Sequence, residues 1–573
     1  MLNALTLYSR VQKTNGLSIL LVGALVLLIG FIIILASVPP VSRDALTHHL
    51  AIPKLYLKHG GIYEIPSIQF SYYPMNLDLL YMVPLYFEND IIPKFIHFSF
   101  ALLTAWLIFG YLRTRTSMIN GLAGALFFLS LPVIVKLSIT VYVDLGLIFF
   151  STAALISLFR WIESDFKWKY LILSAVCCGL AMGIKYNGLI TFFLLTLFIV
   201  FTYARLSANN PKAQSKAIGA GIVFTLVALI VFSPWAVRNI IWTHNPVYPL
   251  YNGWFNSQKT DFADGIAGNS TADAIEESNT IITKSKGKWS NFAVRKIIFD
   301  EKWWEIALIP VRIFFQGEDD NPKYFDGRLN PLLFILPICA FFHIRKDSYK
   351  LKTEKMILVA FSILYILYAF FQTDMRIRYI SPVIPALVIL SILGLNDLTA
   401  VIQKRFKQKK SKTLWLAAVY LVVLVLFCLN IGYLFQQYRT VDPLSFIQNR
   451  ISRDDYIEKY RPEYAAIQFA NKRLTEDAKI LAIFLGHRGY YSDREMIFDF
   501  ALFKNSVHKA VSAEHLTQIL KEGGITHLIV RYDLFNNWSA SQFNDREKAI
   551  IESLFINHAS RLFSKAGYGL FKL

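Results

Sequence analysis

The most restrictive feature of this sequence is an apolar run at residues 17–38 that contains no charged side chain in 22 positions. At about 1.5 Å per residue, a helix of this length crosses a hydrocarbon layer of about 30 Å. A cleaved signal peptide would have a shorter apolar core and a small-residue cleavage site, but VPPVSRD follows here. We therefore predict a retained transmembrane helix.

Similar apolar segments recur along the first three quarters of the chain. Ten more are predicted to span the membrane, at residues 94–112, 119–135, 144–160, 170–184, 187–204, 217–235, 331–344, 356–372, 379–398 and 413–436. Hydrophobic residues make up 55% of the 573 positions and charged residues 17%, which excludes a series of ordinary soluble domains. The predicted fold class is mostly α, a polytopic membrane bundle of about 11 helices.

Basic residues are distributed unequally between the two sides of this predicted bundle. The connections on one side contain 21 Lys and Arg residues, whereas the short turns on the other side contain 4. Because cytoplasmic connections are enriched in basic residues, this asymmetry places the N-terminus in the cytoplasm. The loops at about 39–93 and 236–330, and the chain from residue 437 onward, are then predicted to be extracytoplasmic.

The net charge of the chain does not indicate a nucleic-acid partner. Of the formal charge of +19, residues 438–573 hold only +3, and the remainder lies in the membrane part. The positive-inside rule accounts for it there, so we predict no nucleic acid as partner and membrane lipid instead. All four cysteines fall in apolar segments, so neither a disulfide framework nor a thiolate metal site is predicted.

The last part of the chain has a different pattern. The segments KILAIFL and ITHLIV are predicted as short buried strands, and PEYAAIQFANKRL and SAEHLTQILKEGG as helices. We therefore predict a transmembrane domain at 1–436 and a small extracytoplasmic α/β domain at 437–573. The second domain contains neither G-x-G-x-x-G nor a P-loop, so no nucleotide site is predicted in it.

The sequence VSRDALTHHL, residues 41–50, places a carboxylate and two imidazoles directly after the first predicted helix. Asp44 and His48 are four residues apart, so they would share one face of a helix lying along the membrane surface. His49 would then point to a different face. Asp44 could instead cap that helix by accepting hydrogen bonds from its free N–H groups.

Further ionisable or aromatic side chains are predicted at the same level of the membrane. They come from separate outer turns and comprise Tyr142, Asp144, Lys185, Arg238, Arg376 and Arg378. Ionisable groups beside hydrocarbon are costly and usually mark function, although cations can also extend to lipid phosphates. Two carboxylates among cations suit sugar transfer from a lipid phosphate, because a carboxylate can deprotonate an acceptor hydroxyl while cations hold the phosphate.

Several motifs in this part of the chain resemble a known family. The sequences RDALTHHLAIPKLYLKHGGI, SYYPMNLDLLY, YVDLGLIFF, GLAMGIKYNGL, SPWAVRNIIWTHNPVYP and MRIRYISPVIPAL resemble the GT-C group of membrane glycosyltransferases. Within that group they are similar to bacterial family-39-like proteins, relatives of protein O-mannosyltransferases and aminoarabinose transferases. The resemblance covers about residues 17–400.

The resemblance implies an inverting glycosyltransferase of the bacterial cytoplasmic membrane. Its donor would be a polyprenyl-phosphate-linked sugar, and its acceptor a hydroxyl of a lipid, lipid-linked glycan or protein on the extracytoplasmic face. Asp44 would be the general base, and Asp144 would organise the acceptor side or a metal. A second acid of the first loop would correspond to Glu64 or Asp78. The cations implied to contact the donor are Lys185, Arg238, Arg376 and Arg378.

The acids, the two histidines and Tyr73 also allow other roles. A divalent metal, Mg²⁺ or Mn²⁺, could bind Asp44, His48 and Asp144; apart from that, no cofactor is predicted. Alternatively, His48 and His49 are neutral and hydrogen-bond to substrate or backbone. Tyr73 could contact a sugar or belong to the aromatic belt at the membrane interface.

Two other functions compete with glycosyl transfer. A transporter or flippase of a lipid-linked or anionic substrate could use the same cations, but it would need polar groups through the depth of the bundle. The middles of the predicted helices are almost free of charge. A scaffold with a degenerate GT-C fold would be expected to lose the loop acids, yet Asp44 and Asp144 are both present.

Overall fold

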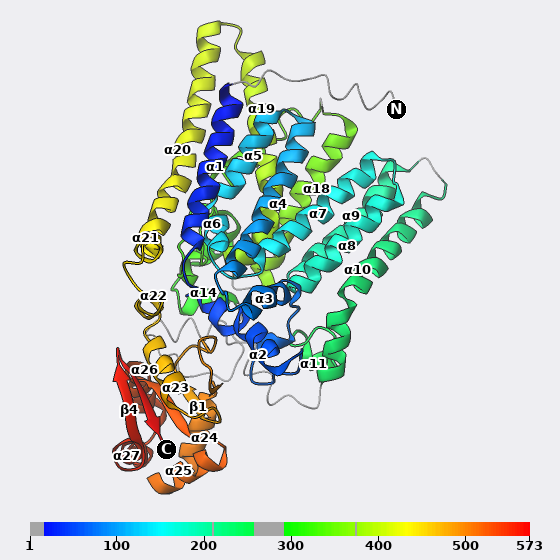
Figure 1. Ribbon diagram of the computed structural model, residues 1–573. Helices are drawn as coiled ribbons and strands as arrows, with labels where there is room; N and C mark the ends of the chain where they lie inside the picture. Colours follow the sequence, from blue (N-terminus) through cyan, green and yellow to red (C-terminus); the bar gives the residue numbers. More distant parts are fainter. Residues whose placement is uncertain (1–15, 209–210, 257–290, 346, 373–374) are drawn as a thin grey trace.

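The computed structural model describes residues 16–208, 211–256, 291–345, 347–372 and 375–573. Figure 1 shows a bundle of long helices with a small α/β unit beyond one end of it. The elements of the first half of the bundle are α1 (Gly16–Ala36), η1 (Ala45–His49), α2 (Ala51–His59), η2 (Gln69–Tyr72), α3 (Asn76–Tyr86), α4 (Ile92–Arg115), α5 (Met118–Ser130), α6 (Pro132–Ser138), α7 (Asp144–Glu163), α8 (Trp168–Ile184) and α9 (Gly188–Leu206). Those of the second half are α10 (Ala213–Thr243), α11 (Asn252–Phe255), α14 (Asn291–Ile297), α15 (Trp303–Ala307), α16 (Ile309–Arg312), η3 (Pro322–Tyr324), α17 (Leu332–Cys339), α18 (Tyr349–Gln372), η4 (Ile377–Val383), α19 (Ile384–Arg405) and α20 (Lys409–Val441).

The predicted membrane-spanning helical fold is confirmed, and the described residues contain fewer long apolar helices than the number of spans predicted. Among the described residues, eight helices are long and apolar enough to cross a membrane, or nine if α5 and α6, which meet at 66°, form one span. The segment predicted at 331–344 contains only the eight-residue helix α17, which includes Pro337. The segment at 170–184 forms the shorter apolar helix α8. Hydropathy identifies apolar segments but not where a helix stops short of the bilayer thickness.

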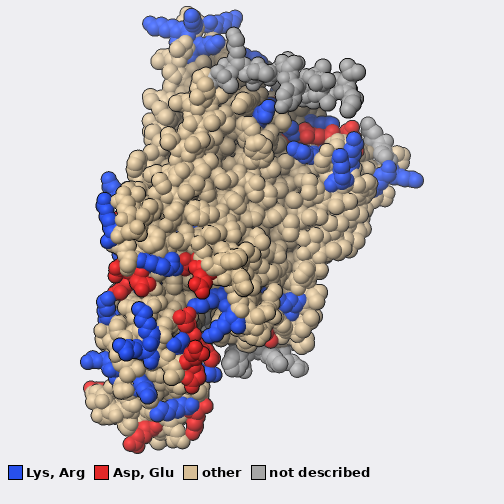
Figure 2. All heavy atoms as spheres, viewed as in Figure 1, with Lys and Arg blue, Asp and Glu red and all other residues tan. Residues whose placement is uncertain are grey.

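The helices of the bundle differ in how much of their surface is covered. α7 and the span formed by η4 and α19 are 78% buried in their most apolar parts, whereas α1 is 22% and α20 only 6% buried. Figure 2 shows that the middle of one face is almost free of charged side chains. Apolar helices with exposed surfaces are suited to lipid contact, and the central position of α7 makes it a rigid support for a site.

The C-terminal unit contains a five-stranded sheet with the strand order β2-β1-β3-β5-β4. β1 is parallel to β2 and β3, and β5 is antiparallel to β3 and β4. The predicted strands and helices of this part are confirmed as β1, β3, α23 and α25. Its elements are α21 (Pro443–Ile447), α22 (Arg453–Tyr460), α23 (Tyr464–Arg473), β1 (Lys479–Ile483), β2 (Glu495–Ile497), α24 (Phe500–Lys509), α25 (Ala513–Glu522), β3 (His527–Arg531), α26 (Tyr532–Gln542), α27 (Asp545–Ser553), η5 (Leu554–His558), β4 (Ser560–Lys565) and β5 (Tyr568–Lys572).

The sheet is buried on both faces, which explains why its central strands are continuously apolar. Ile480 and Ala482 of β1 pack in one cluster with residues of α23, whereas Leu481 and Ile483 pack in another with residues of α24 and α25. Alternate side chains of a strand point to opposite faces, so each face takes every second residue.

The C-terminal unit also contacts the connection between α1 and α2. Arg461 Nε donates to the carbonyl of Val41 (2.6 Å), and the backbone N–H of Tyr490 donates to the carbonyl of Leu46 (3.1 Å). Lys54 Nζ donates to the carbonyl of Tyr490 (3.0 Å). The segment that carries Asp44 is therefore held from both sides, by the bundle and by the C-terminal unit.

Candidate active site

Asp44 lies at the start of the π-helix η1, and its carboxylate forms an ion pair with the guanidinium of Arg378. Arg378 belongs to η4, the 3-10 turn that leads into α19. The pair thus joins residues 334 positions apart in the sequence. The alternative that Asp44 caps the helix is wrong, since its side chain makes no capping hydrogen bond.

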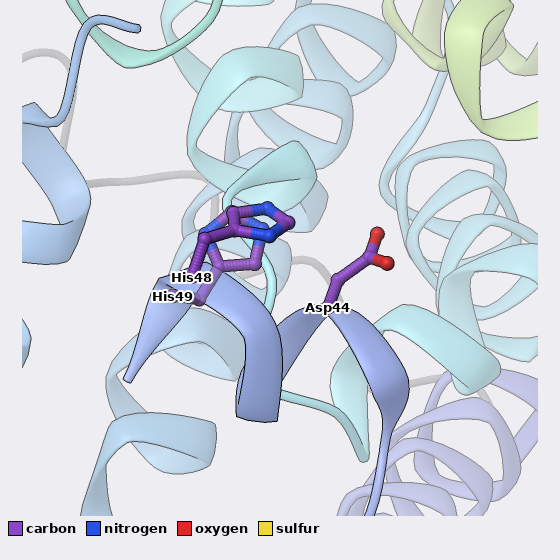
Figure 3. Close-up of side chains that lie close together, drawn as sticks. All are labelled: Asp44, His48 and His49. Atoms are coloured by element: carbon purple, nitrogen blue, oxygen red, sulfur yellow. The ribbon is translucent and has the colours of Figure 1, made fainter. Parts of the chain in front are cut away.

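His48 and His49 lie beside Asp44 because residues 45–49 form a π-helix. The N–H of Leu50 donates to the carbonyl of Ala45, five residues earlier (2.9 Å), so the turn is wider than in an α-helix. The two imidazole centroids are 4.1 Å apart, and Figure 3 shows both rings on the same side of the segment as Asp44. The expectation that the two histidines point to different faces is therefore wrong.

The electrostatic environment keeps Asp44 ionised and both histidines neutral. Burial acts to raise the pKa of the Asp44 carboxyl, but the charge of Arg378, with smaller contributions from His48 and His49, lowers that pKa well below its usual range. Burial lowers the pKa of His48 to about 3 and that of His49 to about 4. At neutral pH this side of the site therefore offers one carboxylate and two uncharged imidazoles.

Asp78, at the start of α3, is the second acid of this group. Its Oδ1 lies 2.7 Å from Nδ1 of His49, and both side chains are buried. Burial raises the pKa of Asp78 to about 8, so the pair keeps a proton at neutral pH. Glu64, the other candidate, accepts a hydrogen bond from the hydroxyl of Tyr72 (2.7 Å). The structure thus places Asp78, and not Glu64, in contact with this group.

Asp144 is the first residue of α7 and pairs with Lys185, which directly follows α8 (2.7 Å). The Asp144 side chain is only 1% exposed. Its Oδ2 is buried and has no hydrogen-bond partner among the described residues. A β-carbon on Gly188 would lie 2.6 Å from the backbone of Ala181, so glycine permits the tight α8–α9 connection that positions Lys185.

His97, which was not among the predicted site residues, fixes the start of α7. Its Nε2 accepts from the N–H of Leu145 (2.9 Å), and its Nδ1 donates to the carbonyls of Leu137 (3.0 Å) and Thr140 (3.1 Å). A lone histidine within the apolar helix α4 is a signal that could have identified it, because polar groups at membrane depth usually have a specific role.

Tyr379 lies between the two ion pairs, and Tyr142 lies beside Arg378. The guanidinium carbon of Arg378 is 5.4 Å from the centroid of each ring, and Lys185 Nζ is also 5.4 Å from the Tyr379 centroid. Both cations are thus beside an aromatic face, an arrangement that stabilises a positive charge. Asp44, Arg378, Asp144 and Lys185 form a single connected group through these rings.

Arg238 lies outside this group. It belongs to α10, which continues to Thr243, so the expectation that it follows the helix is wrong. Its Nη2 donates to the carbonyl of Tyr72 (2.6 Å), and its guanidinium lies 4.6 Å and 4.8 Å from the ring centroids of Trp235 and Trp242. These contacts hold the connection between α2 and α3 against α10.

Arg376 and Tyr73 have partners other than Asp44 in the structure. Arg376 forms an ion pair with Asp326 at 3.5 Å. The Tyr73 ring packs against the rings of Phe70 and Tyr186, with centroid distances of 5.5 Å and 5.2 Å. The guanidinium carbon of Arg376 also lies 6.0 Å from the centroid of Tyr379, so the structure gives both residues protein partners.

The residues around Asp44 can be tested as a metal site. Ligand atoms of Asp44, His48 and His49 all lie within 4.8 Å of one another. Asp144 pairs with Lys185 and is not a member of this set. The third candidate ligand is therefore His49, where the sequence had suggested Asp144. One carboxylate with two neutral imidazoles suits Mn²⁺ or Zn²⁺ better than Mg²⁺, which prefers oxygen ligands.

Comparisons with known proteins give one family match and several structural matches. Residues 91–237 match the family described as dolichyl-phosphate-mannose-protein mannosyltransferase. A comparison with curated protein sequences gives no match. Among solved structures, ArnT from Cupriavidus metallidurans in the apo state has a TM-score of 0.55 at 13% identity, covering 96% of this chain and 97% of that chain.

Two further structures agree with this result. The same ArnT bound to undecaprenyl phosphate has a TM-score of 0.55 at 12% identity, covering 98% of each chain. The apo oligosaccharyltransferase of Archaeoglobus fulgidus has a TM-score of 0.52 at 13% identity, covering 98% of this chain and 75% of that chain. These likenesses give the fold, which is of the GT-C type. The family match over residues 91–237, together with this fold, supports a membrane glycosyltransferase of the GT-C type.

Proposed function

We propose that this protein transfers a sugar from a polyprenyl-phosphate donor to a hydroxyl of a lipid, lipid-linked glycan or protein. The observation that carries the proposal is the ion pair between Asp44 and Arg378 at one end of the bundle, beside the buried pair of Asp144 and Lys185. The ArnT structure with bound undecaprenyl phosphate supports the donor class by similarity of fold.

In the proposed reaction Asp44 accepts the proton of the acceptor hydroxyl. The acceptor oxygen forms a bond to the anomeric carbon, and the bond between that carbon and the phosphate oxygen breaks. The electron pair leaves with the polyprenyl phosphate, whose developing charge Arg378 stabilises. A single displacement of this kind inverts the anomeric centre.

The Asp44–Arg378 pair gives this reaction an order of events. While Arg378 holds the Asp44 carboxylate, the carboxylate is a weak base, because the cation lowers its pKa. A donor phosphate that binds Arg378 competes for the same guanidinium and weakens the hold on Asp44. Donor binding would therefore raise the basicity of Asp44 when the acceptor arrives.

Lys185 and Asp144 are proposed to act beside this pair. Lys185 is 21% exposed and would contribute a second positive charge to the donor phosphate. Asp144, which is 1% exposed, would hold Lys185 in this position through their ion pair. If Mn²⁺ or Zn²⁺ is bound by Asp44, His48 and His49, it supplies a Lewis acid for the phosphate.

The proposed orientation follows from the distribution of basic residues. We infer that the N-terminus is cytoplasmic and that the unit at 437–573 lies outside the bacterial cytoplasmic membrane. Proteolysis of intact spheroplasts should then degrade the C-terminal unit, and proteolysis of inverted vesicles should spare it. The opposite pattern would reverse the orientation.

The test of the proposed activity is transfer of a labelled sugar from native polyprenyl-linked donors to membrane acceptors. Asp44→Asn keeps the size of the side chain but removes the base, and we expect about a 10²- to 10⁴-fold loss of rate. Asp545→Asn is the matched control, because that carboxylate is fully exposed on the C-terminal unit. Chelator is added in a parallel series to test the metal.

Each outcome of this test has a definite meaning. Full activity of a folded Asp44→Asn protein would exclude Asp44 as the base. Absence of transfer by the unmodified protein, together with movement of a lipid-linked substrate across the membrane, would favour a transporter. Loss of transfer on chelation, restored by Mn²⁺ or Zn²⁺ but not by Mg²⁺, would support the metal site.

A further inference from the structure

The C-terminal unit contains a cavity that the proposed transfer reaction does not use. It has a volume of about 450 Å³ and is lined by Arg461, Glu463, Arg488, Arg531, Asp533 and Tyr568. The unit contains neither G-x-G-x-x-G nor a P-loop, so the cavity is not a nucleotide site of either type.

The cavity lies where this sheet topology favours a ligand. β2 pairs with one edge of β1, and the next strand, β3, pairs with its other edge. The direction in which strands are added therefore reverses at β1. In an open parallel sheet, the crevice at the carboxyl ends of two such strands is the usual binding position. Arg488 follows the end of β1, Arg531 ends β3, and Tyr568 pairs with Arg531 in the register of β3 and β5.

The loop after β1 is shaped around one of these arginines. Gly486 has a φ of +62°, and a β-carbon there would lie 2.5 Å from Nη1 of Arg488. Arg488 is 5% exposed and pairs with Glu463, which is 2% exposed. The guanidinium is thus held at the cavity wall by a buried carboxylate.

The charges of the cavity identify a class of ligand. Three guanidinium groups and two carboxylates line it, so an anionic group is favoured while the carboxylates remain able to accept hydrogen bonds from hydroxyls. Tyr532 and Tyr568 add aromatic surface to the wall. Each carboxylate already pairs with an arginine, Glu463 with Arg488 and Asp533 with Arg531, so a ligand anion would share Arg531 with Asp533 while the remaining carboxylate lone pairs accept from ligand hydroxyls. A neutral sugar would not use the excess of guanidinium groups.

We propose that this cavity binds an acidic saccharide, with its carboxylate or phosphate group at Arg531 and its hydroxyls toward the carboxylates. The site goes beyond the proposed transfer reaction, because it lies on the C-terminal unit and needs no donor. It is nevertheless close to the membrane domain, since Arg461 also donates to the carbonyl of Val41, three residues before Asp44.

Two substitutions at the cavity should change affinity in opposite directions. Arg531 pairs with Asp533 through contacts of 2.8 Å and 3.0 Å. Arg531→Gln removes the charge that holds the anion, and we expect about tenfold weaker binding or more. Asp533→Asn removes the carboxylate that competes for Arg531, and binding should become several-fold tighter, about the effect of one weak ion pair. A folding defect cannot produce both results.

The experiment measures binding by saturation-transfer NMR with the full chain in detergent micelles and no donor present. The probes are glucuronic acid, glucose 6-phosphate and glucose. Arg546→Gln, an exposed residue of α27 that does not line the cavity, is the matched control. We expect the two acidic sugars to bind and glucose to bind more weakly, and comparison of the two distinguishes a carboxylate from a phosphate ligand.

Three results would overturn the proposal. The first is no saturation transfer from any probe. The second is equal binding of glucose and the acidic sugars, which would remove the role of the arginines. The third is unchanged affinity in Arg531→Gln, which would place the bound sugar elsewhere. The transfer assay with Asp44→Asn tests a separate group, so the two proposals can fail independently.

Discussion

Two ion pairs of the same chemical kind lie at the same end of the bundle, Asp144 with Lys185 and Asp44 with Arg378, but their surroundings differ. Asp144 is 1% exposed and its pair joins the consecutive helices α7 and α8. Asp44 is 20% exposed and its partner is 17% exposed. A charge that is fully removed from water depends on its partner, whereas a partly exposed one can exchange its partner for substrate.

The structural supports of the two pairs also differ: one lies within the bundle, and the other lies at the contact with the C-terminal unit. The start of α7 is held by His97 from within the bundle, and Gly188 allows the close connection after Lys185. Asp44 lies on a short π-helix that the C-terminal unit contacts through Tyr490. Asp144 is therefore held within the scaffold of the bundle, whereas Asp44 is placed where two parts of the protein meet.

The largest effect is expected from breaking the buried pair. Lys185→Met leaves the Asp144 carboxylate buried without its cation, which should lower the free energy of unfolding by about 3–5 kcal/mol. Thermal unfolding of the purified protein in detergent measures this loss. Arg378→Met is the matched comparison and should cost clearly less, because water reaches both members of that pair.

The double substitution Asp144→Asn with Lys185→Met separates charge from packing. Removing both charges should recover most of the stability lost in Lys185→Met, because no buried charge then lacks a partner. Equal losses in the single and double variants would mean that the side-chain packing of Lys185, and not the ion pair, stabilises this turn.

A second, smaller effect is expected on the pH dependence of transfer. Arg378→Gln removes the cation that lowers the pKa of Asp44, so that pKa should rise. The base is ionised only above its pKa, and the acid limb of the rate profile should therefore move to higher pH. The rate at neutral pH should fall by about 10- to 100-fold, the effect of a charge-assisted hydrogen bond to phosphate. An unmoved acid limb would show that another group is the base.

The sequence predicted the buried pair better than the accessible one. Asp144 and Lys185 lie at the ends of strongly apolar helices, so hydropathy alone places both at the same level of the membrane. The contact of Asp44 with Arg378 joins residues 334 positions apart, and no local pattern encodes it. Arg238 was misplaced because the apolar pattern weakens before α10 ends.

The arrangement of the two histidines could not be read from their spacing. Period-based reasoning assumes hydrogen bonds to the fourth residue, whereas Leu50 bonds to the fifth, and this brings His48 and His49 to one side. The partner of His49 was likewise hidden, because Asp78 lies 29 positions further along in a separate helix. Tertiary packing, and not local propensity, determines these contacts.

The smallest effect is expected at the Asp78–His49 pair, which joins the accessible pair to the buried interior. Asp78 is 2% exposed, and burial raises its pKa to about 8, far above its value in an unfolded chain. Because its pKa is raised in the folded state, the neutral carboxyl contributes to the free energy of unfolding at low pH. This contribution is lost as the pH rises toward 8. The lowered pKa of His49, about 4, acts in the opposite direction below pH 6.5, so the net loss should appear above that pH.

Asp78→Asn keeps a neutral group of the same size and removes this loss. We expect its free energy of unfolding, relative to the unmodified protein, to rise by up to about 2 kcal/mol between pH 6.5 and 8. Asp320→Asn, at a carboxylate that is 84% exposed, should show no such trend. A constant difference between Asp78→Asn and the unmodified protein over this range would mean that Asp78 is already ionised, and that the first loop contributes two negative charges to the site.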